Sequence, residues 1–429
     1  NTFIGAFAGD ALNDADFNVA LGYATLSTDT QGSKSTAIGW ASLNSQNFTT
    51  ATDAENTAVG FQSGMVITTG IQNTFVGSRS GDALTDADFN VAVGHEALTR
   101  DTLGSGSTAI GAFALVTQNF TTATDSHNTA VGKFAGRLIT TGVSNTLIGS
   151  SAGDSLTDAD FNVAIGRNAL ATDTLGSTSI AIGHAALETQ NFTTATTSLN
   201  VGIGHVAGQS VTTGRANVFL GANTANSASS CNDNVFIGFN AGTHSVATTT
   251  GSANTVLGSY AHIGNAGDSN AIAIGHAVTG TSGFTTLGNG GDDIRAAHGN
   301  VTWNTVSDQR YKKDIVNSTA GLAFINDLTP RTFKYKNLGE LPETFGAYEA
   351  GSTEVFKNST TNHGFIAQEV KAAIDAHSEL KDGFTMWGER SDGGQELGEA
   401  ALVPILVKAL QELSAKNDAL TARIAVLEG

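Results

Sequence analysis

The chain has 429 residues, among them 51 glycines and 3 prolines, and carries a formal net charge of −18 at pH 7. This acidic balance, without a basic patch, argues against nucleic acid as a partner. No apolar run approaches the roughly 20 residues that a membrane-spanning helix needs, so membrane insertion is not expected. A single cysteine, Cys231, excludes an intrachain disulfide framework.

A 72-residue block occurs three times in succession between residue 1 and about residue 216. Its opening, Asn1-Thr-Phe-Ile-Gly5, returns with small changes at Asn73, Asn145 and Asn217. A fixed period of this kind is typical of a solenoid or a fibre and not of a globular domain.

A five-residue motif recurs within each block at offsets of 17, 17, 21 and 17 residues, and 16 copies run to residue 271. Its fourth position is always Ile, Val or Leu and its fifth is always Gly, which predicts a very short strand ending in a tight turn. Alternation places the second and fourth positions on one face and the third on the other. Because so short a strand cannot bury a core alone, we expect the copies to stack as a parallel β-roll or β-helix of roughly 75–80 Å.

Such a stack has little apolar volume per residue. Three chains side by side would supply the missing burial, so we expect a homotrimer.

The position just after the invariant glycine is the most variable, which predicts side chains that face outward. It holds aromatic, His and Arg residues suited to a receptor or glycan, since flat rings cover sugar faces and Arg binds carboxylates: Tyr23, Trp40, Phe61, His95 and Arg167. The alternative is that these side chains only cover the edges of the turns or line contacts between chains.

An acidic loop at residues 9–18 returns at 81–90 and 153–162, each time with three Asp in seven residues. Clustered carboxylates are oxygen ligands for Ca²⁺. The spacing of known Ca²⁺ loops is missing, however, and a solvated loop with Asx turns explains the pattern equally simply. We therefore expect neither a metal site nor a cofactor.

The motif decays beyond residue 283, and residues 284–306 are expected to form a neck with a last strand over 300–306. From Ser307 onward all three prolines appear, charged residues become denser and helical periodicity begins, which indicates a separate domain over 307–429. A serine hydroxyl is a poor nucleophile without a base, and Lys312 can serve as that base if burial or the nearby positive charges of Arg310 and Lys313 favour its neutral form. The alternative for this segment alone is a surface turn followed by a basic strand.

The C-terminal segment predicts a helix over 402–428 with a heptad seam: Val403, Leu406, Leu410, Leu413, Asn417, Leu420, Ile424 and Leu427. Such a seam is typical of a coiled coil, which is a second indication of oligomers. The alternative is an amphipathic helix packed on its own domain.

Two resemblances extend this interpretation. The repeats, as in Asn18-Val-Ala-Leu-Gly-Tyr-Ala-Thr-Leu26, resemble the heads of YadA-like trimeric adhesins and repeats in phage tail fibres. The segments Ser307-Asp-Gln-Arg-Tyr-Lys-Lys-Asp-Ile315, Leu328-Thr-Pro-Arg-Thr-Phe-Lys-Tyr335 and His363-Gly-Phe-Ile-Ala-Gln-Glu-Val370, followed by a terminal helix, closely resemble the self-cleaving S74 chaperone domain of phage endosialidases and tail fibres.

The second resemblance implies a trimeric cap that drives folding of the upstream fibre and then cuts itself off between Val306 and Ser307. It implies a Ser307–Lys312 dyad, with Asp308, Arg310 and His363 in supporting roles. The cleavage would be a single-turnover event, so no separate substrate turnover is expected.

The expected fold is therefore mostly β: a trimeric parallel β-roll or β-helix shaft over 1–283, a neck over 284–306, and a smaller α+β chaperone domain over 307–429 ending in a coiled-coil helix. The expected function is a virion tail fibre that binds a host receptor or glycan. The first alternative is a bacterial cell-surface adhesin, or a structural fibre with the same chaperone and no cleavage. A glycan-degrading tailspike would need paired carboxylates in a groove, and the sequence offers only the acidic loops.

Overall fold

A computed structural model describes residues 1–243, 250–300, 303–381 and 383–428. Contacts within the chain divide it into two units, Asn1–Val306 and Ser307–Gly429.

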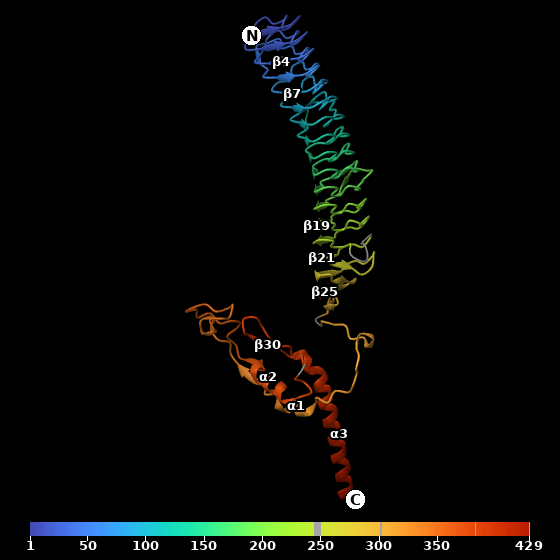
Figure 1. Cartoon of the computed structure of the whole chain (residues 1–429), viewed down its shortest axis with the longest axis vertical. Coiled ribbons are helices and arrows are strands. Elements are labelled where there is room, and N and C mark those ends of the chain that lie inside the picture. The colour runs from blue at the N-terminus through green and yellow to red at the C-terminus, as the bar shows by residue number, and fades with distance from the viewer. Residues whose placement is uncertain (244–249, 301–302, 382, 429) are drawn as a thin grey trace. The chain divides into compact units, whose positions relative to one another are not determined.

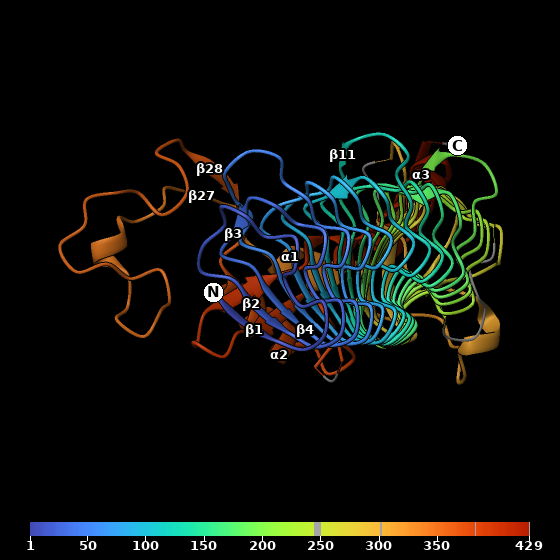
Figure 2. The ribbon, with the colours of Figure 1, turned by 90° about the horizontal axis from the view of Figure 1, so that it is seen from above.

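The first unit is a β-solenoid of about 17 turns, stacked one on the next (Figures 1 and 2). Each turn contributes one strand to a continuous parallel ladder, and consecutive strands pair position for position, as Thr74 with Val91 and Val76 with Val93. The ladder consists of β1 (Thr2–Ile4), β2 (Val19–Leu21), β4 (Thr36–Ile38), β6 (Thr57–Val59), β7 (Thr74–Val76), β8 (Val91–Val93), β10 (Thr108–Ile110), β12 (Thr129–Val131), β13 (Thr146–Ile148), β14 (Val163–Ile165), β16 (Ile180–Ile182), β18 (Val201–Ile203), β19 (Val218–Leu220), β20 (Val235–Ile237), β21 (Thr255–Leu257), β23 (Ile272–His276) and β25 (Phe284–Asn289).

Shorter two-residue strands pair elsewhere on the turns. In each block, a strand of the 21-residue turn pairs with one of the turn before it. These pairs are β3 (Gly32–Ser33) with β5 (Thr52–Asp53), β9 (Gly104–Ser105) with β11 (Thr124–Asp125), and β15 (Gly176–Ser177) with β17 (Thr196–Thr197). Nearer the end of the solenoid, β22 (His262–Ile263) pairs with β24 (Thr279–Gly280).

The interior is filled by the third motif position together with the ninth residue from the motif start. Where the third position is Ala, as at Ala92, the ninth is often Leu, as at Leu98, and both are fully buried. Where the third position is large, as at Phe75, the ninth is Gly81, and a Cβ there would lie 2.5 Å from the Phe75 ring. Large and small residues compensate within these turns, as close packing requires. Where both positions are small, as at Ala58 and Gly64, the neighbouring turns fill the space with Leu43 and Phe75.

The glycine at the fifth motif position is required by the stacking itself. Gly77 has φ +136°, and a Cβ on it would lie 2.5 Å from the carbonyl oxygen of Gly94 in the next turn. Any side chain here would both strain the backbone and collide with the turn below, which explains why the position never varies.

The asparagine at the first motif position binds consecutive turns together. The side chain of Asn145 is fully buried, its Oδ1 accepts a hydrogen bond from the backbone N–H of Asn162, and its Nδ2 donates to the carbonyl of Ala159. The same two bonds recur at Asn18, Asn56, Asn73, Asn90, Asn128, Asn162, Asn200, Asn217, Asn234 and Asn254. This asparagine ladder satisfies backbone groups that the short strands leave unpaired.

Three motif copies begin with serine, and there a buried carboxylate and amide extend the polar network. Asp101 Oδ1 accepts from the backbone N–H groups of Gly104 and Phe120, and Gln118 Nε2 donates to Asp101 Oδ2 and to Ser107 Oγ. The arrangement repeats at Asp29 with Gln46 and at Asp173 with Gln190. The carboxylates are buried because each is saturated with donors.

The segment predicted as a neck continues the solenoid in its first part. Residues 284–289 form β25. This strand pairs in parallel with β23 and in antiparallel with β26 (Asp292–Ala297). The predicted strand over 300–306 shows a single bridge, between Asn304 and Arg295, and residues 301–302 lie outside the described part of the chain.

The second unit is a small α+β domain. It contains η1 (Gln309–Tyr311), α1 (Leu322–Asp327), β27 (Arg331–Phe333), η2 (Leu338–Glu340), β28 (Asn362–Gly364), α2 (Ala367–Ala376), β29 (Trp387–Glu389), β30 (Gln395–Leu397), η3 (Glu399–Ala401) and α3 (Leu402–Glu428). β27 pairs antiparallel with β28, and β29 with β30. The core gathers around the fully buried Phe324 of α1 and includes Val370 and Ile374 of α2 and Leu402 and Ile405 of α3.

A largely buried histidine forms an ion pair that joins α1 to the end of α2. The His377 imidazole, only 13% exposed, lies 2.8 Å from Asp327 and 3.2 Å from Glu379. Hydrogen bonding to Asp327 raises the pKa of His377 above its ordinary value of 6.5.

The predicted fold class, mostly β with a smaller α+β domain ending in a long helix, is confirmed. No described helix is both long and apolar enough to cross a membrane.

Candidate functional site

The predicted nucleophile and base meet at the start of the second unit. Asp308 caps η1 by accepting a hydrogen bond from the backbone N–H of Arg310, and the single 3-10 turn brings the chain back on itself. As a result, Lys312 Nζ donates to Ser307 Oγ over 2.8 Å. This is the contact distance that proton transfer from serine to lysine requires.

Arg310 does not act as a free positive neighbour of this pair. Its guanidinium is bound to Asp308, with an Nη2 to Oδ2 distance of 2.5 Å, and this interaction holds the pKa of Asp308 below its ordinary range. The Asp308 carboxylate therefore compensates the charge of Arg310 locally, and the supporting role of Arg310 stays a prediction. In the single chain Ser307, Arg310 and Lys312 are all exposed.

His363 belongs to a different element from Ser307 and Lys312. It lies at the centre of β28, opposite Thr332 of β27. It makes no hydrogen bond with Ser307 or Lys312 within the described residues. The two motifs that carry Tyr335 and His363 in the sequence are thus neighbouring strands, and they line one wall of an open cavity of about 790 Å³.

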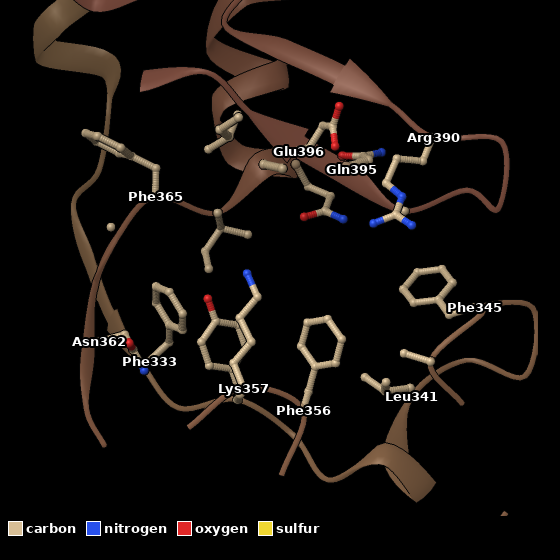
Figure 3. A pocket seen from close by; sticks show the side chains of 18 of the residues that line it. Phe333, Leu341, Phe345, Phe356, Lys357, Asn362, Phe365, Arg390, Gln395 and Glu396 are labelled. Carbon is tan, nitrogen blue, oxygen red and sulfur yellow. The ribbon is translucent and has the colours of Figure 1, made fainter. Parts of the chain in front are cut away.

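Sequence reasoning missed this cavity because its residues come from two segments, 333–368 and 390–399, that no sequence pattern connects. Figure 3 shows the rings of Phe333, Phe345 and Phe356 on one side and the polar side chains of Arg390 and Glu396 on the other. The only available signal was the number of aromatic residues between 333 and 365, and nothing in the periodicity pairs them with the segment near 390.

The C-terminal helix presents two different faces. Leu402, Ile405 and Ala409 are buried against the domain, and the Glu412 carboxylate accepts a hydrogen bond from the backbone N–H of Leu322 at the start of α1. The heptad seam lies on another face and is exposed, from Leu406 at 48% to Leu427 at 83%. The first part of α3 thus packs on its own domain, as the alternative expected, while the seam is exposed in the single chain and a coiled coil between copies stays a prediction.

The predicted outward column after the invariant glycine is exposed, and its rings stack on one another. Tyr23 and Trp40 stack with an interplanar angle of 6°, and Trp40 and Phe61 with 16°, on consecutive turns. Farther along, Arg167 bonds to His184, and His95 contacts Phe113 edge to face. Stacked rings cover each other's faces and leave mainly their edges for a ligand. A receptor-binding role for these residues remains a prediction.

The acidic loops use their carboxylates within the solenoid. Asp88 Oδ1 accepts a hydrogen bond from the backbone N–H of Ile71, and Asp86 Oδ1 accepts from the Thr69 hydroxyl. Among the described residues, no three His, Cys, Asp or Glu side chains gather closely enough to hold a metal ion. The loops at 81–90 and 153–162 thus act as polar links between turns.

Comparison with known proteins gives one match. Residues 307–379 match the model of the Peptidase_S74 family, described as chaperone of endosialidase. Searches among curated proteins and among solved structures found no match. The chain therefore carries an S74-type chaperone domain C-terminal to a long β-solenoid. The match includes Ser307, Lys312 and His363 and ends before α3, whereas the resemblance drawn from the sequence motifs extended to residue 429.

Proposed function

We propose that the chain forms a homotrimeric fibre for attachment to a host receptor or glycan, with a C-terminal chaperone that directs trimerisation and folding and then cleaves itself off. The observation that carries this proposal is the 2.8 Å contact between Ser307 and Lys312 at the first residues of the family match. We further propose that this fibre is a tail fibre of a virion.

In the proposed cleavage, Ser307 Oγ adds to the carbonyl carbon of the preceding residue, Val306, and Lys312 takes the hydroxyl proton. The same proton passes to the Ser307 amide nitrogen as the C–N bond breaks, which leaves an ester between the two residues. Water then hydrolyses the ester and gives a Val306 carboxylate and a free Ser307 amine. Splitting a difficult amide hydrolysis into two acyl transfers is the general benefit of a covalent nucleophile.

General-base use of a lysine requires an environment that disfavours its charge. Since both members of the pair are exposed in the single chain, we infer that assembly with other copies buries them, and that cleavage follows assembly.

The chaperone role follows from the difficulty of aligning three repetitive shafts. A one-turn slip leaves most of the ladder paired, so correct register is hard to select, and long-range pairing is slow and prone to aggregation. An independently folding cap joined through the exposed seam of α3 would hold three shafts in register and raise their effective concentration.

Separate expression of the full chain and of the shaft alone tests this function. The full chain with Ser307→Ala, which keeps the cap attached, should yield a trimeric fibre, whereas residues 1–306 alone should yield aggregates or monomers by native mass. Efficient assembly of residues 1–306 on their own would contradict a chaperone role for the second unit.

A further inference from the structure

One face of the solenoid is uncharged along its whole length. The second and fourth motif positions point outward from the ladder, and every fourth position from Ile4 to Leu287 is Ile, Val or Leu. The second positions are Thr, Val or Ile throughout. No charged side chain occurs in either column at any turn of the ladder, although the chain as a whole carries a net charge of −18.

This uncharged strip is only partly covered in the single chain. Residues of the fourth position are half-buried or exposed at every turn, for example Ile148 at 37% and Leu220 at 41%. About 17 turns at roughly 4.8 Å, with a strip about 10 Å wide, give an uncharged face on the order of 800 Å², apolar at every fourth position. That equals one side of a standard protein interface.

The columns on either side of the strip are mixed in character. The position after the glycine contains Lys133 and Arg167, and the position just before the motif contains Lys34 and Glu55, which lie 3.8 Å apart. An uncharged centre with a polar border is the anatomy of a protein–protein interface.

We propose that this strip is the inner surface along which two further copies of the same chain pack, in parallel and in register. A partner must offer an uncharged surface of the same length and the same rise per turn, and another copy of this chain provides both. This inference rests on the proposed homotrimer and adds the face that forms it. It also assigns the stacked rings of Tyr23, Trp40 and Phe61 to the border of the interface, where their edges meet a neighbouring chain.

Thiol labelling of the full chain tests the proposal. Ile148→Cys lies in the strip and Leu138→Cys lies outside it, yet the two native side chains are equally exposed in the single chain, at 37% and 38%. The native Cys231 is fully buried, and burial raises the pKa of its thiol to about 11, so it contributes little labelling. Packing against other copies should slow maleimide labelling at position 148 at least tenfold relative to position 138.

Native mass on the same samples separates this inference from the proposed function. A trimer in which both thiols react at equal rates would overturn the packing face and leave the trimeric fibre intact. A monomer would overturn both. Should Ile148→Cys fail to fold, Ile180→Cys, at the second motif position of a different turn and also 37% exposed in the native chain, provides the same comparison.

Discussion

Removing one amide from the asparagine ladder should destabilise the solenoid far more than its size suggests. In Asn145→Ala the backbone N–H of Asn162 loses its acceptor at 3.0 Å, and the carbonyl of Ala159 loses its donor at 2.8 Å. Each buried polar group left unpaired costs about 1–3 kcal/mol. The expected loss is therefore about 2–6 kcal/mol per chain, a large part of the stability of an ordinary domain.

Asn119→Ala is the matched control, because Asn119 is exposed and accepts one hydrogen bond, from the Thr102 hydroxyl at 3.2 Å. Its effect should stay within about 0.5 kcal/mol. Urea unfolding followed by circular dichroism measures both variants, and hydrogen exchange should show faster exchange at the amide of Asn162 only in Asn145→Ala. Equal unfolding midpoints for the two variants would refute the role given to the ladder.

Three further outcomes are expected. Gly81→Ala should lower the melting temperature of the shaft, because Ala at φ +58° costs about 1–2 kcal/mol and its Cβ would meet the Phe75 ring; an unchanged melt would contradict the packing described. The stability that His377 adds to the chaperone domain should be fully present below about pH 6.5 and lost as pH rises through its raised folded-state pKa. Thermal melts from pH 6 to 8 should show this loss in the wild type and not in His377→Gln, and parallel profiles would exclude it. Lys312→Arg should abolish cleavage while the protein still assembles, since arginine keeps its proton, whereas Lys313→Arg should cleave normally; cleavage in Lys312→Arg at the wild-type rate, followed on gels, would rule out the dyad.

Much of the solenoid could be predicted because its physics is local. The alternation within each motif and the invariant glycine determine which side chains point inward, and Ala92 and Gly77 take the places that the pattern indicates. The compensation between Phe75 and Gly81 was missed, although it is visible in the sequence, because it links positions six residues apart across a turn and follows neither the strand period nor the helix period.

The second unit was less accessible to sequence reasoning. The resemblance to the S74 family indicated that Ser307 and Lys312 act together, and the 3-10 turn that joins them depends on the local cap by Asp308. The pairing of Arg310 with Asp308 depends on side-chain geometry, which spacing does not determine. The aromatic cavity brings together distant segments, and no periodic pattern reports on such contacts.

The central claim is that a trimeric fibre carries a chaperone that cuts itself off before Ser307. Intact mass and native mass of the purified wild-type chain, measured beside Ser307→Ala, test it most directly. The account predicts trimers in both, with fragments ending at Val306 and beginning at Ser307 in the wild type alone. An uncut wild-type chain, or the same fragments in Ser307→Ala, would contradict it.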